Sequence, residues 1–280
     1  MNKKAFIFVN ISVLLFGFAG LFGKWIDLPA LGITFGRVFF SSIALGLFML
    51  ITKQPFRVNN SKDLKLLLLS GVFLAVHWWS IFVSIQLSTV AIGTITFSTF
   101  PMFVTFAEPL VKHEKPRMRN VLIALVIFIG VLITIPEFSF ENNMFKGVLV
   151  GMISPIAYTV ITMLNKEFSD SYSGTLISFY EQSTATIILL PFVLAMGIHP
   201  TLKDIGLLLV FGTVTTAFAH TLFISSLKYI SARLAGVCSS METVYGILFA
   251  MLLLGEVPSV REVAGGAIIL ITVIYAQLKE

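Results

Sequence analysis

The chain has 280 residues, of which 57% are hydrophobic and only 12% are charged, and its mean hydropathy is +0.96. Because a soluble domain carries about a quarter charged residues, this composition excludes a water-soluble protein and indicates one that is integral to a membrane. The single cysteine, Cys238, excludes a disulfide framework and a Cys-based metal site within this chain, and the net charge of +5 would suit a nucleic acid only if the basic residues shared one surface.

Ten segments are apolar over about the 20 residues that a membrane-spanning helix needs. In chain order they cover residues 5–24, 30–51, 64–86, 88–111, 119–136, 144–165, 174–196, 204–226, 231–254 and 259–278. Proline residues lie at or near several junctions, where a missing backbone N–H costs least. The first segment follows Lys3 and Lys4 like a secretory signal, but it is longer than one and has a counterpart at 147–165, so we expect it to be a retained helix.

The positions of Lys and Arg predict the orientation of these helices. With the N-terminus inside, 14 of the 19 basic residues lie in inside connections and 4 in outside ones, while Arg37 lies within a helix. We therefore expect a multi-pass protein of the cytoplasmic (inner or plasma) membrane with both termini in the cytoplasm. Topology accounts for the positive charge, so membrane lipids are expected partners, a nucleic acid is not, and a homodimer stays open.

The chain repeats itself at an offset of about 142 residues. Lys24 recurs as Lys166, and Glu114-Lys-Pro116 recurs as Glu256-Val-Pro258. A period of this length indicates a duplicated structural unit.

The two copies are predicted to be residues 1–140 and 141–280, with five helices each. Because five is odd, the second copy crosses the membrane in the opposite sense from the first. The predicted fold is therefore an all-α integral membrane protein whose ten transmembrane helices form two inverted five-helix repeats, which is typical of secondary transporters.

Several stretches resemble the EamA-type members of the drug/metabolite transporter superfamily. They are Ala217–Gly236, Leu252–Pro258 and, in the first copy, Phe100-Pro-Met-Phe103 before Glu114-Lys-Pro116. The resemblance covers nearly the whole chain and implies a ten-helix carrier without a cofactor, often an exporter of amino acids or other small metabolites. Glu242-Thr243 replaces the Glu-Pro that the family often shows, which is expected to alter the bend of the ninth helix.

Ionisable residues inside membrane helices are expensive and therefore candidates for function. Together with nearby aromatic residues, they give a predicted site for substrate binding or coupling: Arg37, His77, Trp78, Tyr158, Glu181, His220, Glu242 and Tyr245. Glu242 lies on a small and polar helix face, which favours a cavity wall over a packing role. Arg37 and Glu181 occupy nearly matching positions in the two copies, so they either serve opposite gates, pair across a cavity or only neutralise each other.

His77 and His220 either relay protons or are structural, and neither has the spaced His or Cys partner of a metal site. Trp78, Tyr158 and Tyr245 form a candidate aromatic wall for a cationic amine. Proline 155 is expected to bend the sixth segment. The fourth and ninth segments are rich in small and hydroxyl residues, and we expect both to border the transport path.

The sequence therefore predicts a secondary transporter that moves small organic metabolites, amino acids or related amines, by alternating access. Export is the expected direction, and a proton is a candidate coupling ion. The alternative is an intramembrane enzyme acting on lipid or prenyl substrates. That alternative needs clustered carboxylates for a metal ion or a His/Asp motif, and the predicted helices lack Asp except at their ends.

Overall fold

The computed structural model describes residues 3–111, 118–230 and 232–278, so the predicted turn at Glu114-Lys-Pro116 lies outside the described residues. Within those ranges all regular structure is helical. In chain order the helices are α1 (Lys3–Gly17), α2 (Ala19–Trp25), α3 (Ala30–Ile51), α4 (Ser61–Leu87), α5 (Val90–Phe97), α6 (Phe100–Val111), α7 (Met118–Thr134), α8 (Asn143–Gly151), α9 (Ile153–Phe168), α10 (Gly174–Ala195), α11 (Leu202–Val210), the π-helix η1 (Phe211–Phe218), α12 (Ala219–Leu227), α13 (Ala232–Leu254) and α14 (Val260–Leu278).

Seven helical stretches of the described chain are long and apolar enough to cross a membrane by length and composition. Two further apolar helices, Met118–Thr134 and Cys238–Leu254, are shorter. These helices confirm the prediction of an all-helical, multi-pass membrane protein. The count of ten spans and the inversion of the two copies stay predictions.

The outward faces of the bundle carry large apolar side chains. On α3, Phe39, Ile43 and Leu47 recur at every fourth position and are exposed, and on α7 Leu122 and Ile129 are exposed in the same way. Apolar patches of this kind are not stable against water. They suit contact with lipid chains, so the hydrophobic surface lies outside and many of the polar groups lie inside.

Several predicted spans are divided into consecutive helices. The break between α5 and α6 precedes Pro101, which has no N–H to continue the helical hydrogen bonds. The break between α8 and α9 lies at Met152, three residues before Pro155, where the sequence predicts a bend. At an offset of 142 from Pro101 stands Thr243, and α13 runs through it without interruption, in agreement with the expected effect of the Glu242-Thr243 departure.

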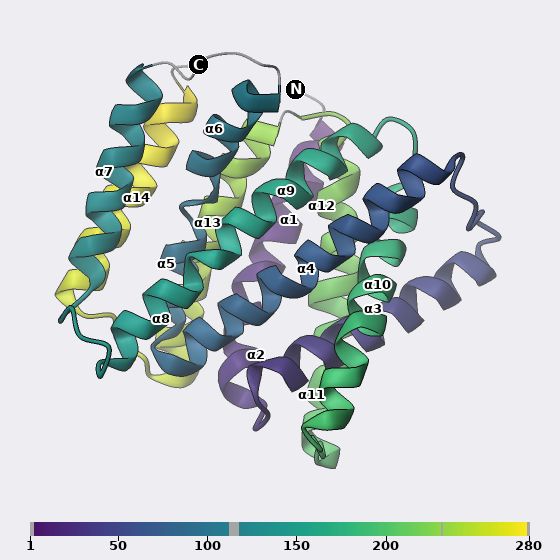
Figure 1. Cartoon of the computed structure of the whole chain (residues 1–280), viewed down its shortest axis with the longest axis horizontal. Helices are drawn as coiled ribbons and strands as arrows, with labels where there is room; N and C mark the ends of the chain where they lie inside the picture. Colours follow the sequence, from purple (N-terminus) through teal and green to yellow (C-terminus); the bar gives the residue numbers. More distant parts are fainter. Residues whose placement is uncertain (1–2, 112–117, 231, 279–280) are drawn as a thin grey trace.

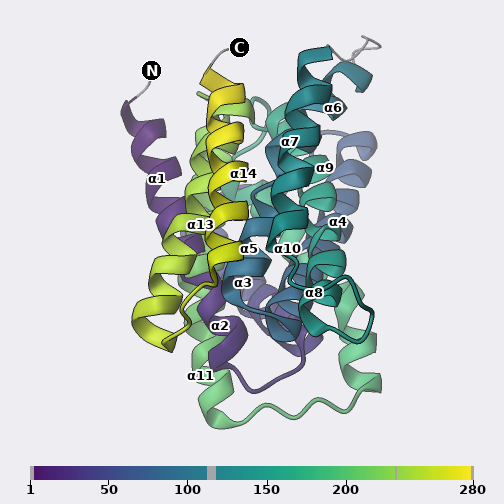
Figure 2. The same ribbon diagram turned by 90° about the vertical axis from the view of Figure 1, so that its left-hand side faces the viewer.

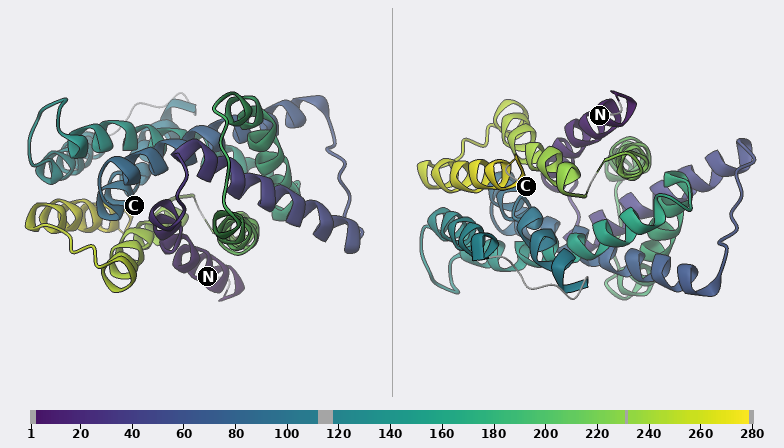
Figure 3. Two further views of the ribbon diagram at one scale, coloured as in Figure 1. Left: turned by 90° about the horizontal axis from the view of Figure 1, so that it is seen from below. Right: turned by 90° about the horizontal axis from the view of Figure 1, so that it is seen from above.

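The start of α1 and the end of α14 lie at the same face, at the top of Figure 1, which we call the termini face. The end of α2, the start of α11 and the α13–α14 connection lie at the opposite face. Helices α7 and α14 pack together at one end of the molecule, and the α3–α4 connection lies at the other end (Figures 1 and 3). Figure 2 shows α13 beside both α1 and α14. The remaining helices surround the centre, where the polar side chains gather.

Close helix packing beside the centre depends on Gly71 of α4. A Cβ at this position would lie 2.8 Å from the backbone oxygen of Glu181 on α10. Small residues let membrane helices approach closely, so Gly71 sets the distance between α4 and α10.

We predict that Gly71→Ala lowers the melting temperature of the detergent-purified protein, because overpacking a tight contact costs about 1–3 kcal/mol. The matched control is Gly206→Ala on α11, where no atom lies within 4 Å of the added Cβ. That control should melt at the wild-type temperature or slightly above it, since Ala is a better helix former than Gly. Equal melting temperatures for the two variants would contradict this account of the contact.

Candidate functional site

A narrow cavity lies between helices from both halves of the chain. Its volume of about 30 Å³ leaves room for one or two water molecules. The residues that line it are Phe16, Ala19, Gly20, Arg37, His77, Trp78, Ile81, Phe82, Ile85, Thr94, Phe97, Tyr158, His220 and Glu242. Six of the eight residues predicted from the sequence are therefore brought together around one space.

Arg37 is held in this cavity by aromatic rings. Its guanidinium carbon lies 3.7 Å from the centre of the Trp78 ring and 4.3 Å from the centre of the Phe211 ring. Its Nε donates a 3.1 Å hydrogen bond to Oγ1 of Thr216. The side chain is 2% exposed, so a permanent positive charge is fixed at the cavity wall by cation–π contacts and one hydrogen bond.

The π-helix η1 supplies two of these contacts. Phe211 and Thr216 are five residues apart, and the hydroxyl of Thr216 donates a 2.9 Å hydrogen bond to the backbone oxygen of Phe211. Wider π-helical turns inside α-helices are frequent at functional sites. Here the wide turn places an aromatic ring and a hydroxyl on the same guanidinium.

His77 is fixed by contacts with α9. Its Nδ1 shares a 2.7 Å hydrogen bond with Oγ of Ser154, the first polar residue of α9. The imidazole also lies against Tyr158, with ring centres 4.7 Å apart. Ser154 and Tyr158 are one turn apart on α9, so the same face of this helix contacts His77.

His220 and Glu181 form a buried pair behind the cavity wall. Nε2 of His220 lies 2.9 Å from Oε2 of Glu181, and the hydroxyl of Ser70 donates a hydrogen bond to the other carboxylate oxygen. His220 also packs edge-on against Trp78, with ring centres 5.7 Å apart. The alternative in which Arg37 pairs with Glu181 is wrong, because Glu181 is fully buried against His220 and Arg37 contacts Thr216 instead.

Glu242 reaches the cavity from α13. The next residue, Thr243, donates a 2.8 Å hydrogen bond to the backbone oxygen of Thr94 on α5. This bond joins the fourth and ninth predicted segments beside the carboxylate. Both segments line the cavity, through Thr94 and Glu242.

Two predicted site residues lie outside the cavity lining. Glu181 contributes only through His220, as described above. Tyr245 does not line the cavity in this structure: it packs against Gly17 of α1 and lies near Phe249, with ring centres 6.4 Å apart. Its predicted role in the site stays a prediction.

Sequence reasoning missed several lining residues. Phe16, Phe82 and Phe97 are three of 27 phenylalanines, and nothing in their spacing distinguishes a cavity wall from ordinary packing. Thr216 carried a signal as a hydroxyl one turn before His220, but its role depends on the π-helix. No pattern of apolar residues in the sequence predicts the π-helical turn.

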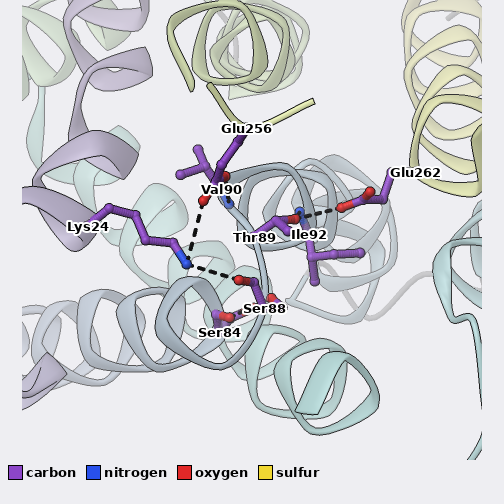
Figure 4. A network of polar contacts seen from close by, with 8 residues as sticks. All are labelled: Lys24, Ser84, Ser88, Thr89, Val90, Ile92, Glu256 and Glu262. Carbon is purple, nitrogen blue, oxygen red and sulfur yellow. Dashed lines mark hydrogen bonds and ion pairs between the residues drawn. The ribbon is translucent and has the colours of Figure 1, made fainter. Parts of the chain in front are cut away.

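A polar network joins helices at the face opposite the termini (Figure 4). Nζ of Lys24, at the end of α2, lies 3.6 Å from a carboxylate oxygen of Glu256 and donates a 3.0 Å hydrogen bond to the backbone oxygen of Ser88. The other carboxylate oxygen of Glu256 accepts a 3.0 Å hydrogen bond from the backbone N–H of Val90. The network therefore joins α2, the α4–α5 junction and the α13–α14 connection.

A second hydrogen bond extends this network to α14. The hydroxyl of Thr89 donates a 2.6 Å hydrogen bond to Glu262, whose carboxylate also accepts the backbone N–H of Ser259 at 2.7 Å. The start of α5 is thus attached to the start of α14.

Different contacts hold the termini face. Nζ of Lys166 donates a 2.6 Å hydrogen bond to the backbone oxygen of Leu227, the last residue of α12. Tyr172 donates a 2.5 Å hydrogen bond to Asp63 at the start of α4. Desolvation of its hydroxyl and this bond raise the pKa of Tyr172, so the phenol stays protonated at neutral pH and keeps the contact.

Among the described residues, no three His, Cys, Asp or Glu side chains gather as a set of metal ligands. The cavity offers a guanidinium, a carboxylate, two imidazoles and hydroxyl groups on an aromatic wall. These groups suit ionic and hydrogen-bonded recognition of a small polar molecule.

The EamA-like transporter family model matches residues 3–135 and again residues 145–276. An uncharacterized transporter of Archaeoglobus fulgidus is 27% identical over 270 residues, covering 96% of this chain and 94% of the relative. The pseudopaline exporter CntI of Pseudomonas aeruginosa is 27% identical over 256 residues (88% and 86%). The S-adenosylmethionine uptake transporter of Rickettsia prowazekii is 23% identical over 257 residues (88% and 83%).

One crystal structure of another protein has the same fold, with a TM-score of 0.73 over 100% of this chain and 99% of that one, at 15% sequence identity. The family and its named relatives confirm the resemblance found in the sequence, and they identify a membrane transporter rather than an intramembrane enzyme. The chain belongs to the EamA-like transporter family.

Proposed function

We propose that this transporter is a secondary carrier that moves small organic metabolites, amino acids or related amines, across the cytoplasmic membrane by alternating access. One observation carries the proposal: a cavity between the two halves holds four ionisable side chains, Arg37, His77, His220 and Glu242. Ionisable groups are costly inside a membrane and mark substrate or ion pathways. Within the proposed carrier, these side chains bind the solute.

The proposed units are two inverted repeats, residues 1–140 and 141–280. The family model matches each half separately, and the repeat-related residues Lys24 and Lys166 each donate to a backbone oxygen at the end of a helix. The distribution of basic residues supports a cytoplasmic termini face. The Lys24–Glu256 network then faces away from the cytoplasm.

Alternating access requires that the closure of each face can break in turn. The Lys24 and Glu256 side chains are 27% and 25% exposed, and ion pairs at such exposure contribute only about 0–1 kcal/mol. Movement of α13 and α14 away from α2 and α5 would open the cavity to the outside. The network is therefore the proposed outer gate.

Export is the proposed direction, and a proton is the proposed coupling ion. The pseudopaline relative is named an exporter, whereas the S-adenosylmethionine relative is named an uptake transporter. For coupling, His220 and Glu181 are ionisable side chains 2.9 Å apart in the protein interior, and His220 also lines the cavity.

We predict that Glu242→Gln lowers transport at least about tenfold while the protein remains folded. Loss of one charge-assisted contact should weaken solute binding by about 1.5–3 kcal/mol, or roughly ten- to hundredfold. The measurement is uptake of radiolabelled amino acids and amines by proteoliposomes. Tyr245→Phe, on the same helix but outside the cavity, is the matched control and should retain activity. Full activity of Glu242→Gln would remove this residue from the site.

Breaking the outer gate should expose the cavity. In a Cys238→Ser background with Thr94→Cys as a reporter, Lys24→Ala should increase labelling by a membrane-impermeant thiol reagent added from outside. Lys203→Ala removes an exposed lysine from the start of α11 and serves as the control. Equal labelling of the two variants would argue against a gate at Lys24.

Proton coupling predicts a specific defect in His220→Gln. Accumulation driven by a pH gradient should fall to the level without a gradient, while exchange of labelled for unlabelled solute should continue. Loss of both activities would indicate a structural role for His220, and retained gradient-driven accumulation would exclude it as the coupling residue.

A further inference from the structure

Two side chains that can carry opposite charges, Arg37 and Glu242, line the cavity without forming an ion pair. Arg37 is 2% exposed and Glu242 is 8% exposed, and both border the same space. No ion pair within 4.0 Å joins them in the described part of the chain. A buried ionisable group without a protein partner is costly to keep charged unless something else satisfies it.

Arg37 and Glu242 each have hydrogen-bonding atoms without a partner among the described contacts. Within the described contacts, Arg37 donates only from Nε, to Thr216, so its two terminal nitrogens have no protein acceptor. The same contacts give the Glu242 carboxylate no hydrogen-bond donor. Neither group is among the inaccessible side-chain nitrogen and oxygen atoms that lack a hydrogen-bond partner. The spare donors and acceptors therefore face the cavity.

The position of Arg37 favours a planar anion. Stacking between the rings of Trp78 and Phe211, together with the Thr216 bond, limits rotation of the guanidinium. Its free edge presents two parallel N–H donors, the geometry that matches a carboxylate. Glu242 offers the complementary acceptor for an ammonium group.

On the basis of the proposed transport function, we propose that the site selects a zwitterion that carries a carboxylate and an ammonium group in one small molecule. The carboxylate binds Arg37, the ammonium group binds Glu242, and the rest of the solute lies along Phe97 and Tyr158. A simple amine would leave Arg37 uncompensated, and a simple acid would leave Glu242 uncompensated. Arg37 is thus a specificity-determining residue, and the cavity widens from its narrow form to admit the solute.

The test uses matched probes on the detergent-purified full chain. One set is L-phenylalanine, L-phenylalaninamide and 3-phenylpropionate, and a second set is L-methionine, L-methioninamide and 4-(methylthio)butanoate. Dissociation constants come from titration calorimetry or concentration-dependent thermal shift. At least one of the two zwitterions should bind about tenfold or more tightly than both its amide and its deaminated acid, because a polar site left unpaired rejects the incomplete analogue.

Variants assign each charge to its partner. Arg37→Gln should weaken the zwitterion more than the amide and so remove the preference between them. Glu242→Gln should weaken the zwitterion more than the deaminated acid and so remove that preference. Arg37→Lys keeps the positive charge but loses the two parallel N–H donors of the guanidinium, so it should give an intermediate preference for the zwitterion. This variant also provides the test if Arg37→Gln does not fold. Tyr245→Phe should match the wild type for every probe.

The outcomes separate this inference from the transport proposal. Equal affinity of an amine or an acid and its zwitterion, no binding of either zwitterion, or equal weakening of all probes by Arg37→Gln would overturn zwitterion selection. If proteoliposomes then move a different organic solute and this movement depends on Glu242, the proposal of transport through this cavity is retained and zwitterion selection is rejected. If no organic solute moves, the transport proposal itself fails.

Discussion

The structure depends on keeping a permanent positive charge stable inside an apolar bundle. Arg37 cannot lose its proton, and it has no carboxylate within ion-pair distance among the described residues. In place of a carboxylate, its guanidinium contacts the rings of Trp78 and Phe211 and the hydroxyl of Thr216. Since these partners come from α4 and η1, α3 must pack against both, and the cavity follows from that packing.

Interrupted helices make this arrangement available. A regular α-helix would carry Phe211 and Thr216 on diverging faces, because five residues exceed one turn, whereas the π-helix aligns them. Just after the break before α9, Ser154 and Tyr158 both contact His77. Irregular backbone inside a membrane protein is tolerated where it borders a cavity, so the interruptions and the cavity support each other.

Much of the fold and part of the site were predictable from the sequence. The apolar segments and the offset of 142 residues reveal long helices in two related halves, and the rarity of charge among them identifies Arg37, His77, His220 and Glu242. Helical periodicity does not predict that Tyr245 contacts Gly17, because this contact depends on the tertiary position of α13. It also missed the partner of Glu181, since matching positions in two copies do not determine which helices touch. Thr216 and the phenylalanine walls depend on a local change of helical pitch and on side-chain packing.

The two best-defined acid–base contacts differ in exposure, and this difference indicates where movement is easiest. His220 and Glu181 are 2% and 0% exposed, and Ser70 adds a further bond to the carboxylate. Separating that pair would leave polar groups buried without partners, at high cost. Lys24 and Glu256 are about a quarter exposed, so water can solvate both ends when they part. A conformational change in the proposed carrier should therefore break contacts at the faces of the bundle and leave the central pair intact, so that the cavity keeps its chemical groups as access to it changes.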